Sequence, residues 1–170
     1  MVKKIVAIWA QDQNGLIGKE DKLPWYLPAE LQHFKEVTMG QIILMGRVTF
    51  DGMGRRVLPG RQTVILSRDA SYQIDHENVL VFHNLDELFN WYQEQDKNLF
   101  IIGGAQIFSL FESYLDQLIL TRVHAQVEGD TYFPSDFNLD AFSLEKEVFR
   151  PKDDKNVYDF TVEFYQRKAK

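Results

Sequence analysis

Short apolar runs recur from one end of the chain to the other, and each is bounded by polar residues, glycine or proline. The runs are rich in β-branched side chains and alternate little with polar residues, a pattern typical of strands buried on both faces of a sheet. We therefore predict strands over residues 5–10, 41–45, 63–66, 79–82, 99–102 and 118–123.

Apolar residues at helical spacing lie between several of these runs. Pro28 suits the first position of a helix, and Leu31, Phe34 and Val37 follow it on one side. The segments LDELFNWYQEQ, from residue 85, and AQIFSLFESYL, from residue 105, carry similar apolar stripes. MGRVTF, from residue 45, joins a predicted strand to another helix start.

The C-terminal part of the chain has a different pattern. AFSLEKEVF and VYDFTVEFY alternate apolar and polar residues, and the polar stretch RPKDDKN joins them, as in an antiparallel hairpin. Strands that alternate with helices and end in a hairpin predict a mixed α/β sheet that is mainly parallel. The 170 residues contain no linker or internal repeat, so we expect one domain spanning residues 1–170.

Composition and charge argue against several classes of protein. The chain is 45% hydrophobic and 26% charged, which is ordinary for a globular domain. Its formal net charge of −6 argues against nucleic acid or an anionic membrane as the main partner, while a local basic pocket for a small anion stays open. The sequence has no cysteine, which rules out disulfides and thiolate metal sites within it.

The histidines and the N-terminal segment give weaker indications of the same kind. The histidines at positions 33, 76, 83 and 124 lack metal-site spacing, and no metal is expected. The apolar stretch in MVKKIVAIWAQD is too short for a signal peptide or a membrane span. We therefore expect a cytoplasmic protein.

Three junctions at predicted strand ends carry groups that suit a phosphate. The Gly103–Gly104 pair starts a helix, Arg47 and Thr49 begin another, and Ser67 and Arg68 follow a third strand. Strand ends on one side of a parallel sheet converge on a ligand crevice, so these junctions indicate an adenine dinucleotide. The two arginines favour a 2′-phosphorylated form. The alternative interpretation is a tight turn and two surface charges.

Glu30 is a single carboxylate among apolar residues in LPWYLPAELQHFK. In one interpretation it is a solvated acid in the first turn of a helix, where the helix dipole favours it. In the other it lies in an apolar pocket with a raised pKa and helps to protonate a substrate or binds a nitrogen heterocycle through both oxygens. The spacing alone does not decide between them.

Five motifs together resemble one enzyme family. LPWYLPAELQHFK, ILMGRVTF, LPGRQTVILSR, IIGGAQIF and VEGDTYFP stand in the order and approximate spacing of dihydrofolate reductase, most like the enzymes of Gram-positive bacteria such as streptococci. The resemblance implies a mainly parallel eight-stranded sheet with about four flanking helices and a C-terminal antiparallel hairpin. It also implies NADPH-dependent reduction of 7,8-dihydrofolate to 5,6,7,8-tetrahydrofolate, with protonation at N5.

The resemblance also assigns catalytic roles. Glu30 matches the acid that binds N3 and the 2-amino group of the pteridine, a position where many bacterial members have Asp. Because that acid lies far from N5, a water molecule is expected to carry the proton. Thr121 matches a hydroxyl that supports the acid and an ordered water, and Leu23 and Trp25 belong to the same catalytic group.

The substrate would lie against apolar walls, and Arg61 matches the residue that pairs with its α-carboxylate, a role for which arginine is well shaped. The predicted substrate-binding residues are Val6, Ala7, Glu30, Leu31, Phe34, Met53, Leu58, Arg61, Ile102 and Thr121. Antifolates such as trimethoprim or methotrexate are expected to bind the same site.

The resemblance places NADPH along the strand ends. The predicted cofactor-binding residues are Ala7, Ile8, Ile17, Gly18, Gly46, Arg47, Val48, Thr49, Ser67, Arg68, Gly103, Gly104, Ala105, Gln106, Ile107 and Thr131. The bond between Gly103 and Gly104 is expected to be cis. DQNGLIGKEDKLPW corresponds to a loop that closes over the nicotinamide, and Asp130 is expected to support it.

Two other functions stay open on the sequence. One is a reductase of the same fold that acts on a pyrimidine or flavin precursor, against which Glu30, Phe34 and Arg61 together argue. The other is a non-catalytic module that binds a pterin or a nucleotide. The resemblance and the acidic composition favour a monomer that binds neither nucleic acid nor membrane.

Overall fold

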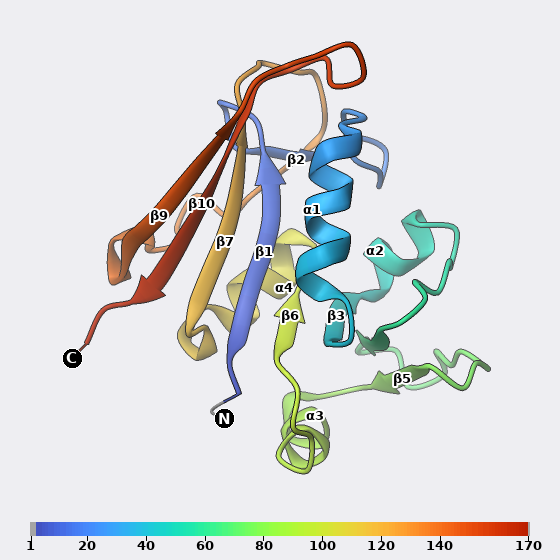
Figure 1. The fold of residues 1–170 in the computed structure, drawn as a ribbon. Helices are drawn as coiled ribbons and strands as arrows, with labels where there is room; N and C mark the ends of the chain where they lie inside the picture. Colours follow the sequence, from blue (N-terminus) through green and yellow to red (C-terminus); the bar gives the residue numbers. More distant parts are fainter. Residues whose placement is uncertain (1–2, 170) are drawn as a thin grey trace.

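Eight strands form one twisted mixed sheet in the order β5-β4-β3-β6-β1-β7-β10-β9, as the computed structural model of residues 3–169 shows (Figure 1). The strands are β1 (Ile5–Gln11), β3 (Ile42–Gly46), β4 (Gln62–Leu66), β5 (Val79–Phe82), β6 (Leu99–Ile101), β7 (Gln117–Val123), β9 (Phe142–Arg150) and β10 (Phe160–Arg167). Pairs from β5 to β7 are parallel, whereas β10 is antiparallel to β7 and β9. The predicted mainly parallel sheet with a closing hairpin is confirmed.

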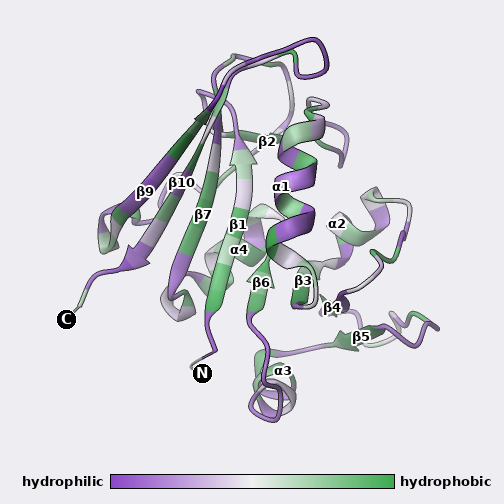
Figure 2. Cartoon of the chain, viewed as in Figure 1, coloured by the Kyte–Doolittle hydropathy of each residue, from purple (hydrophilic) through white to green (hydrophobic). Residues whose placement is uncertain are grey.

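The C-terminal hairpin differs in detail from the prediction. β10 begins at Phe160 rather than at Val157, because residues 151–159 form a broad loop instead of extending the strand pair. The pairing of β9 with β10 also shifts register between Phe164 and Tyr165. β9 is the edge strand and is mostly exposed, and the middle of it is hydrophilic (Figure 2), with Glu145, Lys146 and Glu147 in sequence; charged residues suit an unpaired edge.

A second, two-stranded sheet was not predicted. It pairs β2 (Leu16–Gly18) with β8 (Thr131–Tyr132) in antiparallel orientation. The approach is close at Gly129, where a Cβ would lie 2.6 Å from the carbonyl oxygen of Gly18. Both strands are too short to produce an apolar run, so the sequence pattern missed them.

Four helices flank the sheet. They are α1 (Pro28–Thr38), α2 (Arg47–Gly52), α3 (Leu85–Tyr92) and α4 (Ala105–Phe111), and two short 3-10 turns follow at Glu112–Tyr114 and Leu139–Ala141. Pro28 occupies the first turn of α1, as predicted. The expectation that Leu31 would join the apolar stripe of α1 was wrong, because its side chain is 41% exposed, while the neighbouring Glu30 is buried.

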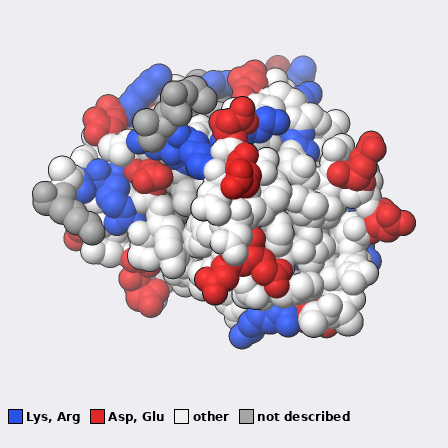
Figure 3. Space-filling model, turned by 90° about the horizontal axis from the view of Figure 1, so that it is seen from below, with Lys and Arg blue, Asp and Glu red and all other residues white. Residues whose placement is uncertain are grey.

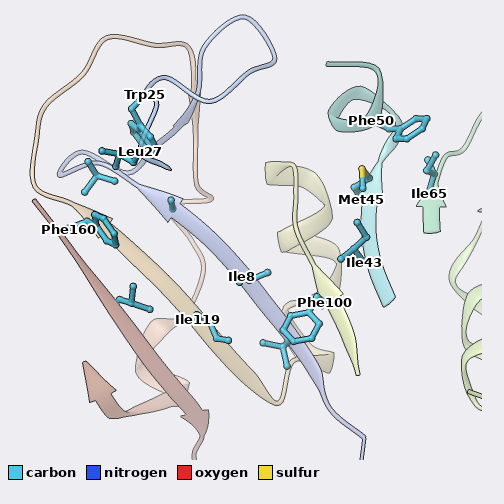
Figure 4. Packing of buried hydrophobic residues seen from close by; sticks show 14 of the residues in the cluster. Ile8, Trp25, Leu27, Ile43, Met45, Phe50, Ile65, Phe100, Ile119 and Phe160 are labelled. Atoms are coloured by element: carbon cyan, nitrogen blue, oxygen red, sulfur yellow. The ribbon is translucent and has the colours of Figure 1, made fainter. Parts of the chain in front are cut away.

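Alternate residues of the strands face two separate cores. The α1-face cluster contains Ile8, Ile43, Phe100 and Ile119, which come from four different strands (Figure 4), and it extends to Trp25 and Leu27. Side chains of α1 pack against it. The α3/α4-face cluster uses the intervening strand residues, among them Ala7 and Trp9, and covers them with side chains of α3 and α4. Strands buried on both faces explain the nearly continuous apolar runs.

The surface carries mixed charges. On the face drawn in Figure 3, Lys and Arg side chains are interspersed with Asp and Glu, without a continuous basic surface.

Within residues 3–169, no helix is both long enough and apolar enough to cross a membrane.

Candidate active site

The carboxyl ends of the neighbouring inner strands β3 and β6 lie side by side. The N–H of Gly46, which ends β3, donates to the carbonyl oxygen of Gly103 at 2.9 Å. The Gly103–Gly104 peptide bond is cis, as the resemblance predicts. A Cβ at Gly104 would lie 3.5 Å from the Thr49 hydroxyl, and one at Gly46 would lie 3.0 Å from Ile107. These glycines bring the starts of α2 and α4 close together at these strand ends.

The third predicted junction lies beside the first two. Gly46 and Leu66 are register partners in the parallel β3–β4 pair, so Arg47 and Ser67 follow paired residues. Ser67 is buried, whereas Arg47, Val48 and Arg68 are exposed and can reach a ligand at the surface. The three junctions therefore converge, as parallel topology requires.

Glu30 lies in the first turn of α1 and is only 7% exposed. The solvated helix-end acid considered for this residue is therefore excluded. Burial raises the pKa of Glu30 to about 7, and interaction with the Thr121 hydroxyl lowers it by a smaller amount. A carboxyl group with a pKa near neutrality can both hold and release a proton under ordinary conditions.

Thr121 comes from the centre of the sheet. It lies on β7 between Ala10 of β1 and Val162 of β10 and is 1% exposed. Because β7 is hydrogen-bonded on both sides, the Thr121 hydroxyl is held rigidly beside Glu30.

The predicted apolar walls surround the start and one side of α1. Phe34, Met53 and Leu58 are partly buried and pack against the α1-face cluster, whereas Leu31 faces solvent. The two other residues of the predicted catalytic group lie in different environments: Trp25 is buried, whereas Leu23 is 50% exposed.

Arg61 is 7% exposed and is held by three hydrogen bonds to two residues. Its Nε and Nη2 donate to the carbonyl oxygen of Pro59 at 3.1 and 2.9 Å, and its Nη1 donates to the Thr38 hydroxyl at 3.3 Å. Burial lowers the pKa of Arg61 below its ordinary value. Its partners are neutral, and the ion pairs among residues 3–169 do not include it. The guanidinium is therefore fixed and without a neutralising carboxylate, which suits it to receive one.

The remaining predicted residues lie on β1, after β6, in the two-stranded β2–β8 sheet and at the start of α4. Val6, Ala7 and Ile8 are buried on β1, and Ile102 follows β6. Ile17 and Gly18 lie on β2, and Gly18 is the register partner of Thr131 on β8. Ala105, Gln106 and Ile107 form the first turn of α4.

Asp130 joins this small sheet to the loop between β2 and α1. Its Oδ2 accepts a hydrogen bond from the N–H of Glu20 at 3.0 Å, and its own N–H donates to the carbonyl oxygen of Gly18 at 3.0 Å. Its Oδ1 accepts from the Thr131 hydroxyl at 2.9 Å. Asp130 therefore holds the loop at the point where the resemblance predicts a closing segment.

The sequence analysis missed Asp12, a carboxylate only 2% exposed at the start of the same loop. Its Oδ1 accepts from the N–H groups of Asn14 and Leu16 at 2.8 and 2.9 Å, and its Oδ2 accepts from that of Val127 at 3.0 Å. The segment DQNG carries the signal of an Asx turn, which indicates this local role. The contact with Val127 has no counterpart in sequence spacing.

Within residues 3–169, no group of three or more His, Cys, Asp or Glu side chains is placed to hold a metal ion.

Comparison with known proteins agrees with this arrangement. The family model described as dihydrofolate reductase matches residues 4–167. The dihydrofolate reductase of Lactococcus lactis is 56% identical over 163 residues, which cover 96% of this chain and 97% of the relative. That of Bacillus subtilis is 35% identical and covers 95% and 93%.

Solved structures give the same answer. The dihydrofolate reductase from Enterococcus faecalis, complexed with NADP(H) and RAB-propyl, superposes with a TM-score of 0.92 at 39% identity, covering 98% of this chain and 97% of that one. The predicted resemblance to enzymes of Gram-positive bacteria is confirmed. Matched over nearly its whole length in sequence and in fold, the chain belongs to the dihydrofolate reductase family.

Proposed function

We propose that the chain reduces 7,8-dihydrofolate to 5,6,7,8-tetrahydrofolate with NADPH, as one catalytic domain spanning residues 1–170. The observation that carries the proposal is Glu30, a buried carboxyl group beside Thr121 with a pKa of about 7. It lies on the face of the sheet where the apolar walls and Arg61 also lie. Family membership supports the same reaction.

Glu30 is the group that recognises the pteridine in this proposal. Its two carboxylate oxygens accept hydrogen bonds from N3 and the 2-amino group, a planar bidentate pairing. A water molecule held by Glu30 and Thr121 carries the proton to N5. Because burial keeps the Glu30 pKa near neutrality, the group can gain and release a proton near pH 7.

The rest of the substrate would follow α1 toward Arg61. Phe34, Met53 and Leu58 provide apolar contacts for the p-aminobenzoyl ring, with Leu31 at the open side. Arg61, whose guanidinium is fixed by Pro59 and Thr38, would then pair with the α-carboxylate of the glutamate tail. A pyrimidine or flavin precursor would not need all of these groups.

NADPH, when bound, supplies the hydride, and the chain orients it. Arg47, Ser67 and Arg68 would hold the 2′-phosphate, and the segment from Gly103 to Ile107 would hold the pyrophosphate. Gly104, the N-cap residue of α4, lies close to Thr49 of α2, so both helix starts face this part of the site. Ala7, Ile8 and Ile17 would face the nicotinamide.

Three further properties belong to the proposal. Antifolates such as trimethoprim or methotrexate would occupy the pteridine site through Glu30. The enzyme would act as a monomer in the cytoplasm, and it would bind neither nucleic acid nor membrane.

The test is NADPH oxidation by the purified protein with and without 7,8-dihydrofolate, alongside Glu30→Gln and an NADH control. Glu30→Gln should lower kcat/KM by roughly 10²-fold or more, because it removes the titratable carboxyl group and its bidentate acceptance of hydrogen bonds from the pteridine. Turnover that prefers NADPH and depends on dihydrofolate supports the proposal. NADPH binding without turnover would contradict it and favour a non-catalytic module.

A further inference from the structure

Helix α1 begins without a cap of its own. The N-cap residue, Leu27, makes no side-chain hydrogen bond to the helix. Pro28 has no N–H, and the N–H of Glu30 donates to the carbonyl oxygen of Leu27 at 3.0 Å. The first-turn donor that remains is the N–H of Ala29, directly before Glu30, and a helix end normally needs a partner for such a group.

That partner comes from the opposite end of the chain. The Oδ1 of Asn156 accepts a hydrogen bond from the N–H of Ala29 at 2.9 Å, across 127 positions of sequence. Asn156 lies in the loop between β9 and β10 and is only 5% exposed. It therefore does for α1 what a side chain at position 27 would ordinarily do.

Asn156 is held in one orientation by Asp153. The Oδ1 of Asp153 accepts from the backbone N–H and the Nδ2 of Asn156 at 2.8 and 2.9 Å, and also from the N–H of Lys155 at 2.9 Å. The N–H of Asp153 donates back to the carbonyl oxygen of Asn156 at 2.9 Å. With its amide nitrogen directed to Asp153, Asn156 must direct its amide oxygen to Ala29.

The loop that carries this pair is itself fixed to the sheet. The Oδ1 of Asp159 accepts from the N–H of Lys152 at 2.7 Å, and its carbonyl oxygen accepts from the N–H of His124 at 3.0 Å. The capping group is therefore anchored beside the end of β7, the strand that also carries Thr121.

We infer that Asn156, oriented by Asp153, is a positioning residue for Glu30, which it holds in the first turn of α1 beside Thr121. This inference deepens the proposed function and rests on it. Without the Asn156 oxygen, the N–H of Ala29 loses its partner and the first turn of α1 opens toward water. The Glu30 carboxyl would then be hydrated, and its geometry toward N3 and the 2-amino group of the pteridine would be lost.

Asn156→Ala tests the inference, and Asp154→Ala, an exposed change in the same loop, is the matched control. We expect Asn156→Ala to lower kcat/KM for dihydrofolate by about tenfold and to leave the NADPH KM unchanged, because the cofactor residues lie elsewhere. The pH at which hydride transfer falls to half should move toward acid, because hydration favours the ionised carboxylate. Asp154→Ala should change none of these.

A second variant keeps the test decisive if Asn156→Ala does not fold. Asp153→Ala leaves the Asn156 amide in place but free to turn, so it should produce the same changes to a smaller extent. A loss of thermal stability in both variants, with dihydrofolate KM and pH midpoint unchanged in the folded enzyme, would overturn the inference, because the cap would then be only structural.

One readout separates this inference from the proposed function. Hydrogen exchange at the Ala29 amide requires no substrate and should accelerate at least tenfold in Asn156→Ala but not in Asp154→Ala. Faster exchange in a protein that does not reduce dihydrofolate would contradict the function but retain the cap. Unchanged exchange in an active enzyme would contradict the cap alone.

Discussion

The two faces of the central sheet bury different kinds of side chain. The α1 face buries polar groups among its apolar side chains, including Glu30, Arg61, Thr121 and Asn156. The α3/α4 face is filled by stacked and edge-on aromatic rings, among them Trp9, which lies 4.2 Å from Phe133 between ring centroids. Where a phenol is buried there, as at Tyr92, its hydroxyl donates to a backbone carbonyl oxygen, that of Lys97.

The two faces also differ in how well their buried polar atoms are hydrogen-bonded. Two buried side-chain polar atoms of the described chain, the His33 Nε2 and the Thr63 Oγ1, have no hydrogen-bond partner. His33 lies on α1, and Thr63 shares its side of β4 with Ile65 of the α1-face cluster. Buried groups that are costly to the fold thus gather on the face where chemistry is proposed, while the opposite face is optimised for packing.

Phe111→Ala should produce the largest loss of stability, and it should disturb packing on the α3/α4 face only. Phe111 is fully buried, so its truncation should cost about 3–5 kcal/mol of unfolding free energy through lost burial and a cavity. Urea denaturation measures this, and kcat at a temperature where the variant is folded should stay close to that of the wild type. The exposed neighbour Leu110→Ala is the control. A loss below about 1 kcal/mol in Phe111→Ala would show that this face is not the stabilising one.

Glu30→Gln, on the α1 face, should have the opposite effect on stability: it should remove activity but raise the free energy of unfolding at high pH. The pKa of Glu30 is about 7 in the folded chain against an ordinary value of 4.5, so folding favours the protonated form. The stability that this proton binding contributes is full below pH 4.5 and is lost as the pH rises through 7. The variant should therefore gain up to about 3 kcal/mol over the wild type near pH 8 and nothing near pH 4.

Urea denaturation of the two proteins across this pH range provides the measurement. Glu36→Gln, which makes the same change on the exposed side of the same helix, serves as the matched control. Equal stability of Glu30→Gln and wild type at every pH would mean that burying Glu30 has no cost.

Asp130→Ala should have a smaller effect, confined to rate, because Asp130 lies on the exposed loop outside both faces. The change removes the acceptor for the Glu20 N–H, and hydride transfer in a single turnover should slow roughly tenfold as the loop closes less often. The melting temperature should hardly change. Glu128→Ala, also exposed and nearby, is the control. An unchanged single-turnover rate would refute the loop role.

The sheet was predictable because burial on both faces leaves a strong signal. The runs around Ile5, Ile42 and Leu99 became strands within one residue of their predicted ends, and Pro28 began α1 as expected. The two-residue β8 was missed, because its pairing depends on the close approach at Gly129 rather than on any apolar pattern. Leu31 was misplaced, because helical spacing gives the apolar side of a helix but not how far the core extends around it.

For the candidate site, the sequence predicted which strand-end residues lie near one another, but it did not predict how buried each side chain is. The convergence of Arg47, Ser67 and the Gly103–Gly104 pair follows from parallel topology, which the sequence pattern already contained. The burial of Glu30 could not be predicted, because the two interpretations of its spacing were equally compatible with a first-turn acid. Asp12 and Asn156 were missed, because their partners Val127 and Ala29 are more than a hundred positions away.

By itself, the sequence determined the alternation of strands and helices, the closing hairpin, the absence of cysteine chemistry and the family resemblance, since all of these are carried by local pattern and motif order. Only the tertiary structure decided that Glu30 is buried beside Thr121 with a raised pKa, that Arg61 is fixed without a counter-charge, and that a distant amide caps α1. The physical reason is that solvation and hydrogen bonding depend on everything that surrounds a group in space, whereas periodicity records only its neighbours along the chain.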